Sequence, residues 1–104
     1  MSVENVRKLQ FRVGPNKDHE NRYKHGVAFD EAATVFKDSK ALSVFDPDHS
    51  ETEERWVTMG LSEKGRLLIV IHTFREESEE AVTIRIISSR KATKQETKTY
   101  GEST

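Results

Sequence analysis

The sequence predicts an α+β fold in which a small, mainly antiparallel sheet is combined with an N-terminal helical hairpin and a C-terminal helix. Two polar-rich segments with helical features occupy the first third of the chain, and strand-like runs rich in β-branched residues follow from residue 55 onward. The last segment carries a helix-start signal. With 104 residues, of which 34% are apolar and 34% charged, the chain is expected to form one domain, residues 1–104, with a modest core. The predicted order is β-α-α-β-β-β-β-α.

The first strand and the first helix are predicted from alternation and from helix-end signals. Leucine, phenylalanine and valine alternate with polar residues over 9–13, as in a half-buried strand. Asn16 can cap a short helix that runs to residue 24 or 25, and Gly26 provides a left-handed stop. Because this helix is mostly polar, only Tyr23 and one edge are expected to be buried.

A second helix is predicted from Asp30 to about Lys37, because apolar residues recur there at helical spacing. The apolar positions are Phe29, Ala32, Ala33 and Phe36. Residues 41–45 are then predicted to form a strand, and residues 46–52 an exposed loop.

The strands of the C-terminal half form the centre of the predicted sheet. Residues 56–60 and 66–73 are expected to pair as a hairpin with a five-residue loop. Leu67–Ile71 is continuously apolar, so this strand is predicted to be central and covered on both faces. A charged connection over 75–80 leads to a strand over 82–88 that pairs with it, and the spacing of Thr93 and Glu96 predicts a capping box at a helix start.

Composition excludes several classes of protein. There is no cysteine, so disulfides and thiolate metal sites are absent, which fits a cytosolic protein. The first ten residues lack the apolar core of a signal peptide, and no segment approaches the length that spans a bilayer. The net charge of −1 does not by itself point to nucleic acid, but the cations concentrate in residues 7–24 and 85–98 and could form a positive patch.

No metal or cofactor site is predicted. Alternating oxygen-bearing residues over 46–54 imitate a calcium loop, but Glu51 stands where glycine is required and Val57 where the bidentate glutamate is required. The four histidines lack a zinc-ligand spacing. No glycine-rich phosphate loop or nucleophile elbow is present either.

The cations around the strand over 82–88 point to an anion site. Arg85 interrupts an apolar run, so its guanidinium must reach solvent, a carboxylate or a ligand. Two hydroxyls, Ser88 and Ser89, and two cations, Arg90 and Lys91, follow where the strand should end. Guanidinium groups bind phosphate bidentately, which favours an anion role for these arginines.

Two further groups keep alternative interpretations. Arg55 begins a strand directly after Glu53 and Glu54 and could simply form a salt bridge with them. Lys24 and His25 close the first helix, where a cation is stabilised by the last carbonyl groups, so they are either capping residues or part of a functional site.

Several segments together resemble the BrnT-type ribonuclease toxins of bacterial type II toxin–antitoxin pairs. The run KHGVAFDEA from Lys24 to Ala32 resembles the K-H-G-V-x-F-x-E-A segment of that family. The other matching residues are Asp46–His49, Glu53–Arg55 and Ile84–Thr93, with Glu96 and Tyr100. The resemblance covers about residues 11–100. Ala28 stands where the family usually has a small hydroxyl residue, so no capping box to Glu31 is expected.

The resemblance implies a RelE-like fold and a metal-independent endoribonuclease that stops translation and growth. In that chemistry a base removes the proton from a ribose 2′-hydroxyl, cations stabilise the phosphorane, and an acid protonates the 5′-oxygen. The implied catalytic residues are Lys24, His25, Arg55, Arg85 and Arg90, and the implied substrate-binding residues are Ser88, Lys91 and Tyr100. The base stays open: His25 has the suitable intrinsic pKa, and Lys24, Glu54 and Tyr100 are alternatives.

The resemblance also implies partners. RNA is the expected substrate, no membrane is involved, and direct DNA binding by the toxin is not expected. The cognate antitoxin is expected to be a small DNA-binding protein of the BrnA type, with a ribbon-helix-helix fold. The alternative is a catalytically weak or inactive toxin-like module whose role is to bind its antitoxin.

Overall fold

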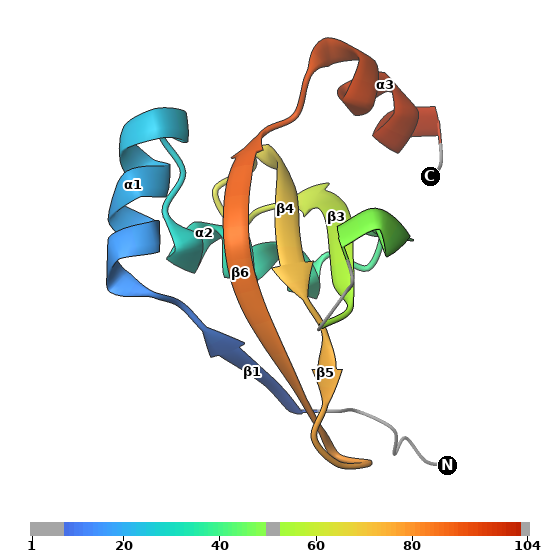
Figure 1. Ribbon diagram of the computed structural model, residues 1–104. Helices are drawn as coiled ribbons and strands as arrows, with labels where there is room; N and C mark the ends of the chain where they lie inside the picture. The colour runs from blue at the N-terminus through green and yellow to red at the C-terminus, as the bar shows by residue number, and fades with distance from the viewer. Residues whose placement is uncertain (1–7, 50–52, 103–104) are drawn as a thin grey trace.

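The computed structural model describes residues 8–49 and 53–102, and its elements follow the predicted order (Figure 1). The strands are β1 (Lys8–Arg12), β2 (Leu42–Phe45), β3 (Arg55–Leu61), β4 (Leu67–Thr73), β5 (Arg75–Glu76) and β6 (Ala81–Lys91). The helices are α1 (Pro15–His25), α2 (Phe29–Ala33) and α3 (Lys94–Glu102), with two 3-10 segments, η1 (Thr34–Lys37) and η2 (Pro47–His49). Two expectations lie partly outside the described residues, namely the tip of the acidic loop at 50–52 and the signal-peptide region at 1–7.

The sheet has the order β1-β6-β4-β3-β2, with β5 also paired to β6. The predicted pairings of β3 with β4 and of β4 with β6 are confirmed, and both are antiparallel. β4 is central, as its apolar run predicted. Two features were not predicted: β1 pairs with β6 in parallel, and the charged connection contains the short strand β5. β1 is also exposed along its length, whereas a half-buried strand was expected.

β6 extends to Lys91, so the prediction that the strand ends near Ser88 is wrong. The pairing with β4 shifts by one position between Ile71 and His72, because Ile71 faces Ser88 while His72 faces Ile86. Ile87 is therefore the extra residue of a β-bulge. This bulge keeps the polar residues after it within the strand and changes which face they occupy.

α1 begins two residues earlier than a cap at Asn16 would allow. Gly14 is the N-cap residue and makes no side-chain cap, while Pro15 occupies the first helical position, where a missing N–H costs nothing. The stop at Gly26 is confirmed, since this residue has φ 70° and its N–H donates to the carbonyl of Arg22. The expectation for Tyr23 is wrong: its side chain is 88% exposed, and Asn21 is the buried residue of this helix.

The second helix is shorter than predicted, because the α-helix ends at Ala33 and continues as the 3-10 segment η1. The tighter 3-10 winding changes the residue spacing, so Val35 becomes fully buried while Phe36 is only half-buried. As expected, Ala28 provides no side-chain cap; instead the backbone N–H of Phe29 donates to Asp18 Oδ1 at 2.9 Å. The two helices of the hairpin are thereby linked.

The core lies between α2, η1 and one face of the sheet. It consists of Val27, Phe29, Ala32, Val35, Leu68, Val70, Val82, Ile84 and Ile86. α2 is also tied to the β3–β4 turn by polar contacts. The buried carboxylate of Glu31 accepts hydrogen bonds from the Arg66 guanidinium and from Ser62 Oγ. The remaining helix, α3, lies beyond the end of the sheet in Figure 1.

α3 begins with the predicted capping box. The N–H of Thr93 donates to Glu96 Oε1 at 2.8 Å, and the N–H of Glu96 donates to Thr93 Oγ1 at 3.1 Å. Within the described residues no helix is long and apolar enough to cross a membrane.

Gly60 is expected to be required for close packing of η1 on β3. A Cβ atom at this position would lie 2.7 Å from Val35 Cγ1 and 3.1 Å from Ala41 Cβ, so Gly60→Ala should destabilise the fold by about 1–3 kcal/mol through overpacking. Gly101→Ala is the matched control, because a Cβ there meets nothing within 4 Å and alanine favours the helix. Thermal unfolding of both variants checks this, and equal melting temperatures would contradict it.

Candidate active site

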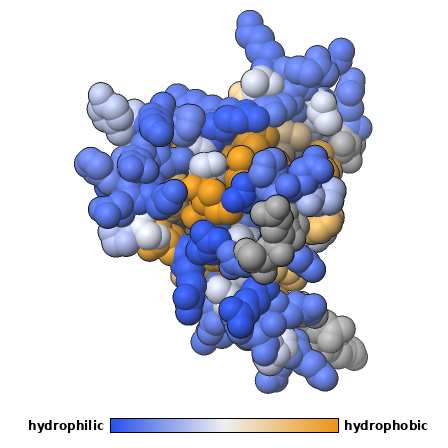
Figure 2. Space-filling view, in the orientation of Figure 1, coloured by the Kyte–Doolittle hydropathy of each residue, from blue (hydrophilic) through white to orange (hydrophobic). Residues whose placement is uncertain are grey.

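The site lies on the face of the sheet opposite the core, which we call the open face. Side chains alternate along a strand, and Leu68 and Val70 of β4 belong to the core, so Ile69, Ile71 and Thr73 point to the open face. Figure 1 shows α2 and the segment that follows it on the far side of the sheet, so the open face is the one in view. Figure 2 shows hydrophobic residues across the middle of this view, with hydrophilic residues around them.

Strand register places three predicted cations and one hydroxyl on the open face. Arg55 pairs with Thr73, and directly paired residues project to the same side of a sheet. Ser88 pairs with Ile71, and Arg90 pairs with Ile69. Because of the bulge at Ile87, Arg85 also projects to this side, where its N–H donates to Thr73 Oγ1 at 3.2 Å. Lys91 alternates with Arg90 and therefore lies on the other side.

Arg85 belongs to a group of arginines at the β1 end of the open face. Its guanidinium forms an ion pair with Glu53, and both side chains are more than 40% exposed. A cavity of about 70 Å³ at this place is also lined by Arg12 and Arg75. Arg12 lies directly opposite Arg85 in the β1–β6 pairing. Three arginines are thus gathered at this end, with Glu53 and Glu77 beside them.

Lys24 and His25 lie apart from this group, at the edge of β6. They line a pocket of about 240 Å³ together with Lys17 of α1 and Ser88 of β6. Within α1, Lys17, Asn21 and Lys24 follow one another at intervals of four and three residues, so they share the side of the helix that lines the pocket. The structure therefore brings the predicted Lys24, His25 and Ser88 together.

Asn21 holds α1 against β6. Its Nδ2 donates to the carbonyl groups of Val27 and Ser89, both at 2.8 Å, and its Oδ1 accepts a hydrogen bond from the N–H of Ser89 at 3.0 Å. The side chain thus provides hydrogen-bond partners for the backbone N–H and carbonyl of Ser89 at the edge of β6, as a neighbouring strand would. β1 covers the same edge further along, at residues 81–85.

Arg90 lies at the opposite end of the open face from Arg85. Its guanidinium donates two hydrogen bonds to Glu96 of α3, at 2.8 and 2.9 Å. This bidentate pair raises the pKa of Arg90. Arg90 is five positions after Arg85, which corresponds to about 15 Å along a strand. The two arginines therefore do not contact one common atom and could at most bind successive groups of an extended ligand.

Tyr100 is hydrogen-bonded to a carboxylate of the chain. Its hydroxyl donates to Asp38 Oδ2 at 2.6 Å, which raises the pKa of Tyr100. Asp38 also accepts hydrogen bonds from the N–H groups of Leu61 and Lys40, so the pKa of this carboxyl is lowered. Glu54 lies on the core side of β3, where it accepts a hydrogen bond from Trp56 Nε1 at 3.3 Å. Of the three alternative bases, Lys24 lines the pocket beside His25, whereas Tyr100 and Glu54 do not line it.

Comparison with protein families decides which class of protein this is. The family described as "Ribonuclease toxin, BrnT, of type II toxin-antitoxin system" matches residues 14–96, most of the chain. The chain belongs to the BrnT family. It is therefore a ribonuclease toxin of a type II toxin–antitoxin system, with an antitoxin as its partner, as the sequence indicated.

The fold of this BrnT toxin agrees with a solved structure. The crystal structure of the Brucella abortus ribonuclease toxin BrnT superposes with a TM-score of 0.53 at 20% sequence identity. The match covers 84% of this chain and all of the other chain. No curated protein matches by sequence.

The sequence missed several residues that shape the site of the toxin. Arg12 was assigned only to a strand and Arg75 only to a charged connection, yet both lie beside Arg85. Asn21 received no role, because nothing in the sequence distinguishes its amide from the other polar side chains of this helix. Among residues 8–49 and 53–102, no group of three His, Cys, Asp or Glu side chains could hold a metal ion.

Acid is expected to weaken the attachment of α3 to the toxin. Arg90, followed by the Thr93 N–H, lowers the pKa of Glu96 from 4.5 to about 2 in the folded state. The free energy of folding that the ionised Glu96 contributes is therefore fully present above pH 4.5 and is lost as the pH falls toward 2. Since both side chains are partly exposed, its size should be only about 1 kcal/mol. Unfolding of wild type and Glu96→Gln at pH 7 and at pH 2 measures it, and a difference that persists undiminished at pH 2 would contradict it.

Proposed function

We propose that this toxin is a metal-independent endoribonuclease that cleaves RNA on the open face. The observation that supports this most is the strand register, which gathers Arg55, Arg85, Ser88 and Arg90 on one face. Lys24 and His25 lie at the edge of that face, beside Ser88. RNA is an extended polyanion, and cations at intervals along β6 suit successive phosphates.

The proposed reaction needs only groups that the substrate and the chain supply. A base removes the proton of the ribose 2′-hydroxyl, and the 2′-oxygen forms a bond to the adjacent phosphorus. The bond to the 5′-oxygen breaks, and an acid protonates that oxygen, which leaves a 2′,3′-cyclic phosphate and a 5′-hydroxyl. Because the nucleophile is internal, no metal-bound hydroxide is required. Guanidinium groups stabilise the negative charge that develops on the phosphoryl oxygens.

We assign the individual roles from where each residue lies. Arg85 and Arg90 would bind phosphate, Arg55 would support them, and Lys24 would stabilise transition-state charge. His25 is our proposed base, since a histidine changes charge near neutral pH and this one lines the pocket beside Ser88. Lys24 remains the alternative. Tyr100 and Glu54 are disfavoured, because one is hydrogen-bonded to Asp38 and the other lies on the core side. Lys91, on the side opposite Arg90, would contact RNA only outside the open face.

The experiment is RNA cleavage by the purified, antitoxin-free toxin in the presence of excess EDTA, on ribosomes and off them. A matched oligonucleotide with one 2′-deoxyribose at the cleavage position should remain intact, while the all-ribose strand yields a cyclic phosphate end. Cleavage of the deoxy substrate would refute internal attack. Loss of activity in EDTA, restored by a divalent metal, would refute metal independence.

A second candidate function is a catalytically weak toxin that mainly binds its antitoxin. The observation that favours it is that Arg85 and Arg90 are each paired with a carboxylate, Glu53 and Glu96. Induced expression in a bacterial host separates the two functions, because the weak module should bind its antitoxin without arresting growth. Growth arrest that depends on Arg85 would rule it out.

We also propose that the antitoxin is of the BrnA type, a small DNA-binding protein with a ribbon-helix-helix fold. The support is family membership, which implies an antitoxin partner. Sequencing the neighbouring reading frame tests this. A DNA shift assay with the toxin alone and with the complex tests whether the antitoxin carries the DNA binding.

A further inference from the structure

An apolar groove lies on the core side of the sheet, next to η1. It has a volume of about 390 Å³ and is lined mainly by Leu9, Phe36, Trp56, His72, Phe74 and Ile84. Leu9 is 39% exposed, and the neighbouring Phe11 and Phe45 are 37% and 41% exposed. Exposed apolar surface gathered around a groove is typical of sites where proteins bind other molecules.

Aromatic contacts give the groove a fixed shape. Trp56 lies between Phe45 and Phe74, with ring centroids 5.2 and 6.4 Å away. On the other side, Phe36 of η1 meets His72 edge to face at 4.8 Å. The lining residues come from strands of the sheet and from η1, with Phe74 at the junction of β4 and β5, so regular structure holds most of the groove. A pre-formed groove costs little reorganisation when it binds.

The polar groups in the floor of the groove already have partners. His72 Nε2 is hydrogen-bonded to Thr58 Oγ1 at 2.7 Å, and that hydroxyl to Ser43 Oγ, also at 2.7 Å. His72 Nδ1 contacts the carbonyl of Thr73 at 3.0 Å. Burial lowers the pKa of His72, so the ring is neutral at pH 7. The groove therefore selects apolar side chains rather than a polar or charged ligand along its floor.

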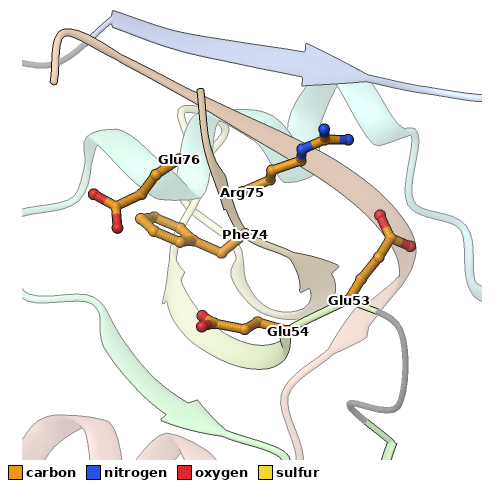
Figure 3. Close-up of a pocket in the computed structure, with 5 residues that line it drawn as sticks. All are labelled: Glu53, Glu54, Phe74, Arg75 and Glu76. Carbon is orange, nitrogen blue, oxygen red and sulfur yellow. The ribbon is translucent and has the colours of Figure 1, made fainter. Parts of the chain in front are cut away.

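One end of the groove is acidic. Phe74 also lines a second pocket, of about 320 Å³, together with Glu53, Glu54, Arg75 and Glu76. Figure 3 shows the Phe74 ring beside the carboxylates of Glu54 and Glu76, with Arg75 and Glu53 directed to the other side. An aromatic ring flanked by carboxylates attracts a guanidinium or ammonium group.

We infer that this surface, the apolar groove and its acidic end, binds a segment of the antitoxin that carries apolar side chains followed by Arg or Lys. The acidic end disfavours RNA, whose phosphates it would repel. A second toxin in a two-fold contact would present the same apolar and acidic surface, whose lining carries one cation, Arg75, to meet these carboxylates. The inference rests on the proposed function only in taking the antitoxin as the occupant. Leu9 and Glu76, the residues to be changed, lie on the core side of the sheet because both pair with Val82, so binding and cleavage can be tested separately.

The test is isothermal titration of the full-length toxin with the protein encoded by the adjacent reading frame. Glu76→Lys reverses a charge at the acidic end, and Leu9→Asp places a charge in the apolar groove. Each should raise Kd about tenfold or more, with RNA cleavage unchanged. Glu102→Lys, an equal charge change on exposed α3, is the matched control and should leave Kd unchanged. Circular dichroism confirms that each variant is folded, and Glu76→Gln replaces Glu76→Lys if the latter is not.

Three results would overturn the inference. The first is a Kd for both groove variants equal to that of Glu102→Lys. The second is loss of RNA cleavage in the groove variants, which would assign the groove to RNA. The third is self-association of the toxin alone that Leu9→Asp abolishes, which would assign it to a second copy. A wild-type toxin that does not cleave RNA, but loses its antitoxin on Glu76→Lys, would instead refute the proposed function and support the docking site.

Discussion

Replacing Arg85 with alanine is expected to lower the rate of RNA cleavage by about 10²-fold or more, which is typical for loss of one group that stabilises transition-state charge. Arg85 lies on the open face with Arg12 and Arg75 beside it, and its backbone is fixed in the middle of β6. A rigid backbone positions the guanidinium without cost at the moment of reaction. The measurement is the single-turnover cleavage rate of a fluorescent RNA by wild type and Arg85→Ala.

Glu53→Gln is the control that separates catalysis from structure. It removes the same ion pair as Arg85→Ala but leaves the cation in place. If the pair only supported the fold, both variants should behave alike. If Arg85 binds phosphate, Glu53→Gln should retain the activity or increase it, because the competing carboxylate charge is gone. Arg85→Ala with wild-type activity would remove this residue from the site.

Replacing Arg66 with alanine is expected to destabilise the toxin by about 3 kcal/mol, because it leaves a buried carboxylate without its cation. Glu31 is only 5% exposed, and Arg66 Nε donates to it at 2.9 Å while a second guanidinium nitrogen forms the ion pair. The arginine is the main cause of the lowered pKa of Glu31. For a domain of this size, the melting temperature should fall by about 12 °C or more. Denaturant unfolding at pH 7 measures the change.

Two controls define the cause. Lys37→Ala breaks the exposed ion pair with Glu63, whose side chains are 74% and 60% exposed, and should cost less than about 0.5 kcal/mol. The double variant Glu31→Leu with Arg66→Met removes both charges, and it should recover most of the loss. A double variant as unstable as Arg66→Ala would show that packing, not the unpaired charge, is responsible.

The features that could be predicted from the sequence depend on residues close together in the chain. Gly26 stops α1 because its own backbone adopts φ 70°, and Thr93 and Glu96 cap α3 because they are three residues apart. The apolar run of β4 predicts a central strand because its residues are consecutive in the chain. Local conformational preferences and short hydrogen bonds decide each of these, so no knowledge of the tertiary structure is required.

The features that were missed depend on contacts between distant residues. The asparagine cap failed because Pro15 and Gly14 already start α1, and Tyr23 was misplaced because Asn21, not an apolar residue, faces β6. The bulge at Ile87 is set by pairing with β4, and it alone determines that Arg85, Ser88 and Arg90 share a face. Without the register, the arginines could be named as an anion site but not divided between the two ends of the sheet.

The pairing of β1 with β6 also bears on how the toxin is made. Gln10 and Thr83, which meet in this pairing, are separated by 73 positions, so nearly the whole chain must be synthesised before they can contact each other. The same holds for Asn21 and Ser89, which join α1 to the last strand. Such long-range contacts form late in folding. A nascent or truncated chain that ends before β6 therefore lacks Arg85, Ser88 and Arg90 as well as the strand that positions α1. Most of the polypeptide is therefore synthesised before the open face can form.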